Sequence, residues 1–301
     1  MSSIALKIDV DTYRGTREGV PRLAGLLECL NVRATFLFSL GPDHTGRAIK
    51  RAFRRGFMGK VKRTSVLKHY GLKTLLYGVL LPGPHIGRRC RALMQDIAGR
   101  GFEVGVHTYD HVKWQDGVSS ASEEWTRREM TLARDEFADI LGRPPLVHGA
   151  AGWQVNAFVP ALEQELGFRY ASDVRGTGPF TPLVNGVPVA VAQLPTTLPT
   201  FDELIGREDL GRIDPVDYLL KLTQAAPERD HVFTLHAELE GGAYLGALER
   251  LIKAWRMAGR RVTDVATYVD GVALQSLPRC AIIAAPVAGR SGTLASQAEA
   301  A

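Results

Sequence analysis

The sequence predicts an α/β fold, a distorted (β/α) barrel of parallel strands and helices. Short apolar segments typical of strands alternate with longer amphipathic segments typical of helices along most of the 301 residues. Such alternation requires right-handed crossovers and produces a parallel sheet. Reactive side chains also follow several of the predicted strands, and in a barrel those strand ends converge on one face. The hydrophobic content of 45% is enough to bury a core of barrel size.

The predicted elements alternate in order along the chain. Predicted strands cover residues 4–11, 34–38, 102–106, 146–151, 170–172, 189–194 and 232–236, and predicted helices cover 17–30, 90–100, 120–141, 157–166, 215–224 and 242–258. The long helix 120–141 is expected to begin with a capping box of Ser120 and Glu123.

No linker divides the chain, so we expect one barrel domain over residues 1–276, including a basic insertion at 44–95. The remaining residues, 277–301, are rich in Ala, Ser and Gly and are predicted to form a disordered tail.

Two histidines follow the predicted strand 102–106. His107 and His111 are four residues apart, so both imidazoles can reach one cation at ~2.0–2.1 Å. The pattern is not that of a zinc protease, because Thr108 stands where that motif requires Glu. Taken alone, the pair could equally be two histidines that happen to lie at a strand end.

Two carboxylates end the first predicted strand. Asp9 and Asp11 are two residues apart and therefore point the same way, so one can bind a cation while the other acts as a base. An Asp-rich turn is the alternative. However, His107, the segment 149–153, Asp173 and His236 also follow predicted strands, and this repeated placement favours a metal site over scattered core residues.

These residues resemble the ordered motifs of the polysaccharide deacetylases, which are metal-dependent enzymes that remove N-acyl groups from sugars on a distorted (β/α) barrel. The resemblance covers roughly residues 4–270. By this resemblance Asp9 is the general base, Asp11, His107 and His111 hold the metal, and His236 is the general acid. The matching segments are Asp9-Val10-Asp11, His107-Thr108-Tyr109-Asp110-His111, Tyr170-Ala171-Ser172-Asp173 and Leu235-His236.

One motif departs from the family pattern. The family has an Arg-x-Pro-aromatic segment whose Arg orients the base, whereas residues 148–154 read His-Gly-Ala-Ala-Gly-Trp-Gln. Arg175 is a candidate for orienting Asp9 instead. This segment and the basic insertion resemble a branch of the family that deformylates an amino sugar carried on a lipid phosphate. Candidate substrate-binding residues are Trp153, Asp173, Arg175, Glu238 and Glu240.

Glu238 and Glu240 follow His236 closely, and a carboxylate there could bind the product ammonium or orient His236. A solvated acidic loop is an equally plausible interpretation. The expected cofactor is a divalent metal ion, and oxygen and nitrogen ligands suit Zn, Mn, Co and Ni alike. Non-haem iron oxygenases use a similar ligand set, but usually on a jelly roll rather than on β/α repeats.

The insertion 44–95 contains 13 Lys and Arg residues and no acidic residue. Within 47–57, apolar and basic side chains occupy different faces of a predicted helix, and the apolar run 74–81 is too short to span a bilayer, which takes ~20 residues. A peripheral anchor on an anionic membrane surface fits both features. The predicted membrane-facing residues are Arg51, Arg54, Arg55, Phe53, Phe57, Leu75 and Leu76.

A solvated basic helix and a nucleic-acid site are the alternatives for this insertion. No nucleic-acid partner is expected, because binding phosphate alone does not require the apolar run. Three widely spaced cysteines and the lack of a signal peptide indicate the cytoplasm, so we expect a peripheral protein on the cytoplasmic face of the inner membrane.

The expected function is metal-dependent hydrolysis of an N-formyl or N-acyl sugar carried by a lipid. A soluble deacetylase of polysaccharides or oligosaccharides is the second enzyme hypothesis. A membrane-docking barrel that has lost catalysis is the hypothesis without an enzyme.

Overall fold

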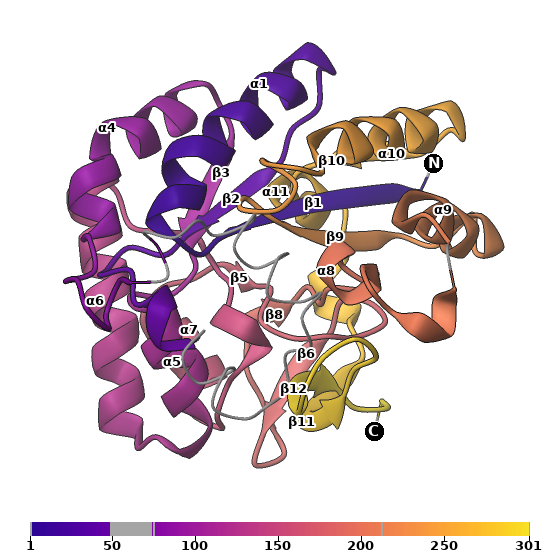
Figure 1. Ribbon diagram of the computed structural model, residues 1–301. Helices are drawn as coiled ribbons and strands as arrows, with labels where there is room; N and C mark the ends of the chain where they lie inside the picture. Colours follow the sequence, from indigo (N-terminus) through magenta and orange to yellow (C-terminus); the bar gives the residue numbers. More distant parts are fainter. Residues whose placement is uncertain (1, 49–73, 75, 212, 301) are drawn as a thin grey trace.

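A curved parallel sheet forms the centre of the structure, a computed structural model that describes residues 2–48, 74, 76–211 and 213–300 (Figure 1). Its strands lie in the order β9–β1–β2–β3–β4–β5–β8, and β10 pairs with the first residues of β1. The strands are β1 (Ser3–Val10), β2 (Thr35–Phe38), β3 (Glu103–Val106), β4 (Val147–His148), β5 (Tyr170–Ala171), β8 (Ala192–Gln193), β9 (His231–His236) and β10 (Arg261–Thr263).

Helices cover the outside of this sheet (Figure 1). They are α1 (Val20–Cys29), α4 (Ile86–Gly99), α5 (His111–Gly117), α6 (Glu123–Leu141), α7 (Val159–Glu165), α8 (Phe201–Leu204), α9 (Pro215–Ala225), α10 (Leu245–Met257) and α11 (Val265–Asp270), and a π-helical turn, η1 (Gly15–Gly19), precedes α1. This alternation confirms the predicted distorted (β/α) barrel. Among the described residues no strand ladder joins β8 to β9; Thr197 instead donates its backbone N–H to Val232 O at 3.0 Å.

Helix α6 shows how local sequence sets an element. Met130, Ala133 and Phe137 recur at helical spacing and are buried against the core. The helix ends at Gly142, whose φ of 70° suits glycine. The predicted capping box is wrong, because Ser122 is the N-cap and accepts from the N–H of Trp125 at 3.3 Å.

The C-terminal residues form a hairpin, so the predicted disordered tail at 277–301 is wrong. β11 (Arg279–Pro286) pairs in parallel with β6 (Thr181–Val184) and antiparallel with β12 (Thr293–Gln297), and β7 (Val187–Pro188) completes this second sheet. The many Ala, Ser and Gly residues of this segment hid the alternation that is typical of strands. Cys280, Leu294 and Ala295 are nevertheless buried, the first and last of them against Val174 and Phe180.

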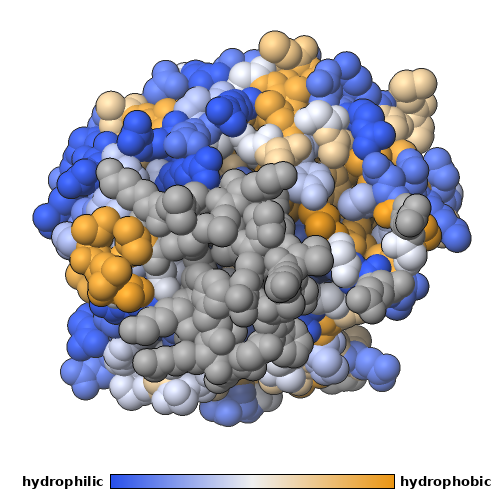
Figure 2. Space-filling view, in the orientation of Figure 1, coloured by the Kyte–Doolittle hydropathy of each residue, from blue (hydrophilic) through white to orange (hydrophobic). Residues whose placement is uncertain are grey.

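The predicted basic helix within 47–57 lies largely outside the described residues, as do Arg51, Phe53, Arg54, Arg55, Phe57 and Leu75. In the described part of the insertion, Leu76, Val79, Leu80 and Leu81 are exposed, Leu80 to 76%. Figure 2 shows a hydrophobic patch on this face beside the uncertain residues. No helix in the described ranges is both long and apolar enough to cross a bilayer.

A fully buried polar cluster joins β4, α7 and β5. His148 Nδ1 lies 2.8 Å from Glu163 Oε1 and 3.0 Å from Asp173 Oδ1, and Gln193 bridges both carboxyl groups. Burial disfavours charge on His148, but Asp173 and Glu163 outweigh it and raise the pKa of His148 to about 10. Burial, reinforced by Asp173, raises the pKa of Glu163 well above its usual value. The cluster therefore holds an ion pair beside a neutral carboxylic acid.

We predict that Asp173→Asn destabilises the fold by ~3–5 kcal/mol, since it leaves the buried His148 cation without its counter-charge. Urea unfolding measures this. The matched control is Asp270→Asn, which removes an exposed ion pair with Arg169 and should change stability little. Equal stability of the two variants would show that the His148 cluster does not contain the ion pair.

Candidate metal centre and catalytic cleft

Strand β1 ends in two carboxylates at the C-terminal edge of the sheet. Asp9 is buried within the strand, and Asp11 follows its last residue. β1 is paired with β2 on one side and β9 on the other, which fixes its backbone here. Glu238 fixes the following turn, because its Oε1 accepts from the N–H groups of Asp11 and Thr12 at 3.2 and 2.8 Å.

The histidine pair follows β3. Thr108 has a φ of 75°, a conformation that costs a non-glycine residue roughly 1–3 kcal/mol and that recurs at functional sites. After this turn Asp110 caps α5, of which His111 is the first residue. Asp110 Oδ2 also lies 2.6 Å from His44 Nδ1, so the beginning of the insertion is attached beside His111. The turn therefore brings His111 back beside His107, with their rings 5.4 Å apart.

The three predicted ligands meet. His107 Nε2 and His111 Nε2 lie 3.3 and 3.5 Å from Asp11 Oδ1. Two donors at 2.0–2.1 Å from one tetrahedral ion would be about 3.3–3.4 Å apart. Asp11 Oδ1 is buried and has no hydrogen-bond partner in the part of the chain that the structure describes. The donor set and its spacing therefore fit a divalent cation.

The His148–Glu163–Asp173 cluster also has metal-ligand atoms close together. Its contacts of 2.8 and 3.0 Å are hydrogen bonds; Ala150 N also donates to Asp173 Oδ1, and Gln193 Nε2 donates to Oδ2. Because those lone pairs are already used, we assign this cluster to structure and the Asp11 site to metal.

Burial and neighbouring charges shift the pKa values of two ligands toward the forms that bind a cation. Burial alone would raise the pKa of Asp11, but His111, His107 and His236 more than offset this and hold it well below its usual range. Burial lowers the pKa of His111 against the opposing effect of Asp11. An ionised carboxylate and a neutral imidazole are the forms that bind metal.

Lys7 is the cation beside the predicted base. Its Nζ, fully buried, lies 3.3 Å from Asp9 Oδ2 and donates to Ser172 O at 2.8 Å. Arg175, the candidate from the sequence, instead pairs with Glu203 at 2.9 Å. Asp9 Oδ1 is left without a hydrogen-bond partner among the described residues. Lys7 therefore holds one oxygen of Asp9, while the other lies 3.8 Å from His107 Nδ1 at the wall of the cleft.

His236 lies across the cleft from the ligands. It is paired in register with Asp9 on the neighbouring strand, and its Nδ1 lies 3.6 Å from Asp202 Oδ1. Burial raises the pKa of Asp202, but Arg290 and His236 outweigh this and lower it. The ring of Trp153 packs against His236 edge to face at 6.1 Å. An ionised carboxylate and an indole thus fix the imidazole.

The cleft has a volume of about 230 Å³. It is lined by Asp9, Asp11, His107, His111, Gln115, Gly152, Trp153, Asp202, His236, Glu238, Leu239 and Arg290. Arg290 comes from the turn of the C-terminal hairpin, lies 4.8 Å from the centre of the Trp153 ring and pairs with Asp202 at 2.8 Å. The hairpin therefore forms part of the wall.

The other candidate substrate-binding residues have mixed positions. Trp153 and Glu238 line the cleft, whereas Asp173 lies in the buried His148 cluster and Arg175 lies behind Trp153, 5.2 Å from its ring centre. Glu240 is fully buried, and its Oε2 accepts from His236 N at 2.8 Å. Its burial excludes a solvated acidic loop at this position.

A family model described as "Polysaccharide deacetylase" matches residues 2–171, more than half of the chain. The chain belongs to the polysaccharide deacetylase family. It is a hydrolase that acts on amide bonds.

Two curated relatives share most of their length with this polysaccharide deacetylase. A Shewanella sediminis protein, "Probable 4-deoxy-4-formamido-L-arabinose-phosphoundecaprenol deformylase ArnD", is 35% identical over 252 residues, 84% of this chain and 81% of that protein. A Wigglesworthia glossinidia brevipalpis protein of the same name is 32% identical over 240 residues, 79% of this chain and 82% of that one.

Solved structures share the fold. A Mycobacterium smegmatis protein, "putative polysaccharide deacetylase", has a TM-score of 0.62 at 20% identity, covering 92% of both chains. A Pseudomonas aeruginosa protein, "probable Polysaccharide deacetylase", has a TM-score of 0.54 at 15% identity, covering 87% of this chain and 86% of that one.

Three residues at the site were missed from the sequence. Lys7 could have been found, because it is two residues before Asp9 on the same face of the strand. Asp202 and Arg290 could not, since they reach the cleft from a short helix and a hairpin turn that strand patterns do not place.

We predict that His107→Ala abolishes stoichiometric metal binding, because the remaining Asp11 and His111 offer too few ligands to retain a cation. Metal analysis of the purified variant, with His231→Ala at the start of β9 as the matched buried histidine, tests this. Full metal occupancy in His107→Ala would refute the ligand assignment.

Lys7→Met should lower kcat by about 10–100-fold with the metal retained, the usual effect of losing a residue that orients a catalytic group. The Michaelis constant should change little, and Lys7→Arg should recover part of the rate. If Lys7→Met has the kcat of the unaltered protein, Asp9 is oriented by something else.

Proposed function

We propose that this chain is a metal-dependent deformylase that acts on 4-deoxy-4-formamido-L-arabinose carried on undecaprenyl phosphate. The observation that supports it most is a single cleft that is lined by the Asp11, His107 and His111 donors, a buried carboxylate and a fixed imidazole. The substrate is proposed from the names of the ArnD relatives, which are 32–35% identical over about four fifths of the chain.

Asp11, His107 and His111 would hold the cation and leave coordination positions open. When bound, the cation polarises the formamide carbonyl and acidifies water at the site. Either Zn, Mn, Co or Ni fits these ligands.

Asp9 acts as the general base of the hydrolysis. Its Oδ1 is free to accept a proton from the attacking water, while Lys7 holds Oδ2 at 3.3 Å. Lys7 also lies 5.6 Å from the centre of the Trp153 ring, a cation–π contact that helps to fix the ammonium group beside Asp9.

His236 acts as the general acid. Its Nδ1 faces Asp202, so Nε2 is the nitrogen that donates a proton to the departing amine. Formate and a free amino sugar on the lipid are the products. The amino sugar carries a positive charge once formed, which suits a role in lipid A modification and resistance to cationic antimicrobial peptides.

The substrate lies in a membrane, so we propose that the protein works at the cytoplasmic face of the inner membrane as a peripheral protein. Leu76, Val79, Leu80 and Leu81, exposed together in the insertion, would enter the interface. The 13 basic residues of 44–95 would face anionic headgroups, each contributing ~1 kcal/mol near the surface.

Asp9→Asn should lower formate release from the lipid-linked formamido sugar by about 10²–10⁴ at unchanged metal content, the usual effect of removing a general base. Formate is measured enzymatically, and acetate release from N-acetylated oligosaccharides is measured in parallel. Acetate release without formate release from the unaltered protein would favour a soluble deacetylase, and release of neither would favour a degenerate barrel.

Reversing Arg51, Arg54 and Arg55 to Glu should release the protein from anionic vesicles while a short water-soluble substrate analogue is still hydrolysed. Salt should weaken binding of the unaltered protein without abolishing it, because the apolar contribution is not screened. The control reverses Lys221, Arg250 and Lys253, which are exposed on α9 and α10 and give the same change in charge. Equal sedimentation of both triple variants with vesicles would show that the insertion is not the anchor.

A further inference from the structure

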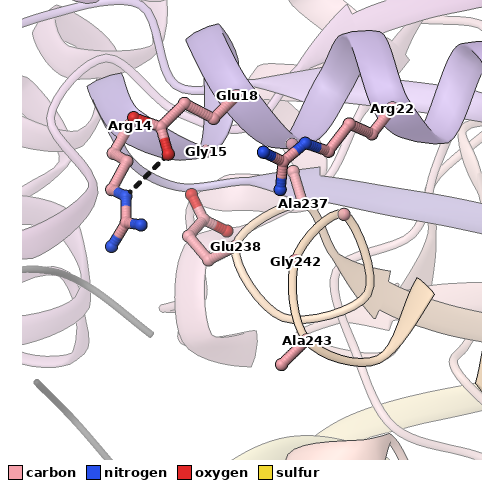
Figure 3. Close-up of a pocket in the computed structure, with 10 residues that line it drawn as sticks. Arg14, Gly15, Glu18, Arg22, Ala237, Glu238, Gly242 and Ala243 are labelled. Carbon is pink, nitrogen blue, oxygen red and sulfur yellow. Dashed lines mark hydrogen bonds and ion pairs between the residues drawn. The ribbon is translucent and has the colours of Figure 1, made fainter. Parts of the chain in front are cut away.

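A second cavity adjoins the catalytic cleft. It has a volume of about 320 Å³ and lies between the π-helical turn with the start of α1 and the loop that follows β9. Figure 3 shows Arg14 and Arg22 on either side of Glu238. Glu238 also lines the catalytic cleft, so the two spaces share this side chain as a wall.

The surface of this cavity is largely backbone, since Gly15, Gly19, Gly241 and Gly242 line it. Close packing requires two of these glycines. A Cβ on Gly19 would lie 2.0 Å from Ala237 O, and a Cβ on Gly241 would lie 2.5 Å from the Cα of Gly19. The glycines therefore let the π-helical turn and the loop after β9 pack closely, which fixes the wall of the cavity.

Two guanidinium groups, of Arg14 and Arg22, line the cavity together with the carboxyl groups of Glu18 and Glu238. Glu238 Oε1 already accepts from Asp11 N, Thr12 N and the hydroxyl of Thr12, so this oxygen is engaged by the ligand turn. Arg22 is exposed and forms no ion pair with any residue that the structure describes. Arg14 Nε pairs with Glu18 at 2.9 Å, a half-exposed contact that a stronger anion can replace.

The cavities differ in the guanidinium groups that line them, and the one between α5 and the start of α6 has a single guanidinium, that of Arg47, beside Lys113. The space of about 460 Å³ between the C-terminal hairpin and the start of α7 is larger, but none of the residues that line it is Lys or Arg. Two guanidinium groups beside a glycine-lined wall are what phosphate oxygens require, because each guanidinium can donate two parallel hydrogen bonds.

We propose that the Arg14–Arg22 cavity binds the phosphodiester that links sugar to lipid in the substrate. This inference rests on the proposed function, because it assumes a phosphate on the far side of the sugar from the formamide. The sugar ring then spans the distance from the Asp11 site past Glu238, and the lipid chain leaves at the open side. The arginines set specificity for phosphate-linked sugars, while Asp9 and His236 perform the chemistry.

Calorimetric titration of the metal-loaded protein with farnesyl phosphate tests the site. Arg22→Gln should raise the Kd by about 10-fold or more, because it removes hydrogen bonds to a charged group, and Arg22→Lys should recover part of the affinity. Glu18→Gln should lower the Kd, since it removes a carboxylate that competes with the phosphate for Arg14. The matched control is Arg17→Gln; Arg17 stacks on Tyr13 at 5.4 Å and does not line the cavity.

Further titrations identify the source of the phosphate. Farnesol should not bind at this site, and inorganic phosphate should compete weakly with farnesyl phosphate. If phosphatidylglycerol vesicles compete as well as farnesyl phosphate does, the cavity takes membrane headgroups and the proposal is overturned. Equal affinities of Arg22→Gln, Arg17→Gln and the unaltered protein would also overturn it.

Kinetic measurements distinguish the phosphate site from the proposed deformylase activity. Arg22→Gln should raise the Michaelis constant for the lipid-linked formamido sugar by a factor similar to the rise in Kd. If the unaltered protein releases no formate yet binds farnesyl phosphate through Arg22, the deformylase function is wrong and the phosphate site stands.

Discussion

The register of four parallel strands determines the site. Val10 of β1 is level with Phe38 of β2, and Phe38 is level with Val106 of β3, so the residues that follow, Asp11 and His107, emerge at the same height. On the other side of β1, Asp9 is level with His236 of β9. Base, acid and two ligands are thus placed by backbone hydrogen bonds, and only His111 depends on a turn.

Placing charge at these strand ends has an energetic cost, and the structure offsets it with fixed partners. Lys7 and Asp9 are both almost fully buried and would be strongly destabilising if either stood alone. The strained turn at Thr108 and the unpartnered oxygens of Asp9 and Asp11 add to this cost. A bound cation would remove much of it, so stability and metal binding should be coupled.

The fold and the ligand set could be predicted from sequence because both follow from local periodicity. Alternating apolar segments give strands, and side chains just after strands meet at one face. Asp11, His107 and His111 are each within one turn of a strand end, so their meeting followed once the barrel was inferred.

The rest depends on long-range packing. Arg290 is 281 residues after Asp9, and it reaches the cleft because β11 pairs with β6. The small residues of this segment do not by themselves predict that pairing. The polar residues Asp173 and Glu240 looked available for substrate, but partners from other elements bury them. Composition likewise could not separate a disordered tail from a hairpin whose buried residues are a cysteine, a leucine, an alanine and a serine.

The proposed function requires Asp11, His107 and His111 to hold a catalytic cation while Asp9 remains outside the ligand set. Anomalous X-ray diffraction from crystals grown with Mn²⁺ or Zn²⁺ would locate that cation. We expect one strong peak about 2.0–2.2 Å from Asp11 Oδ1 and both Nε2 atoms. A peak within the His148–Glu163–Asp173 cluster, or one coordinated by Asp9 in place of Asp11, would contradict it.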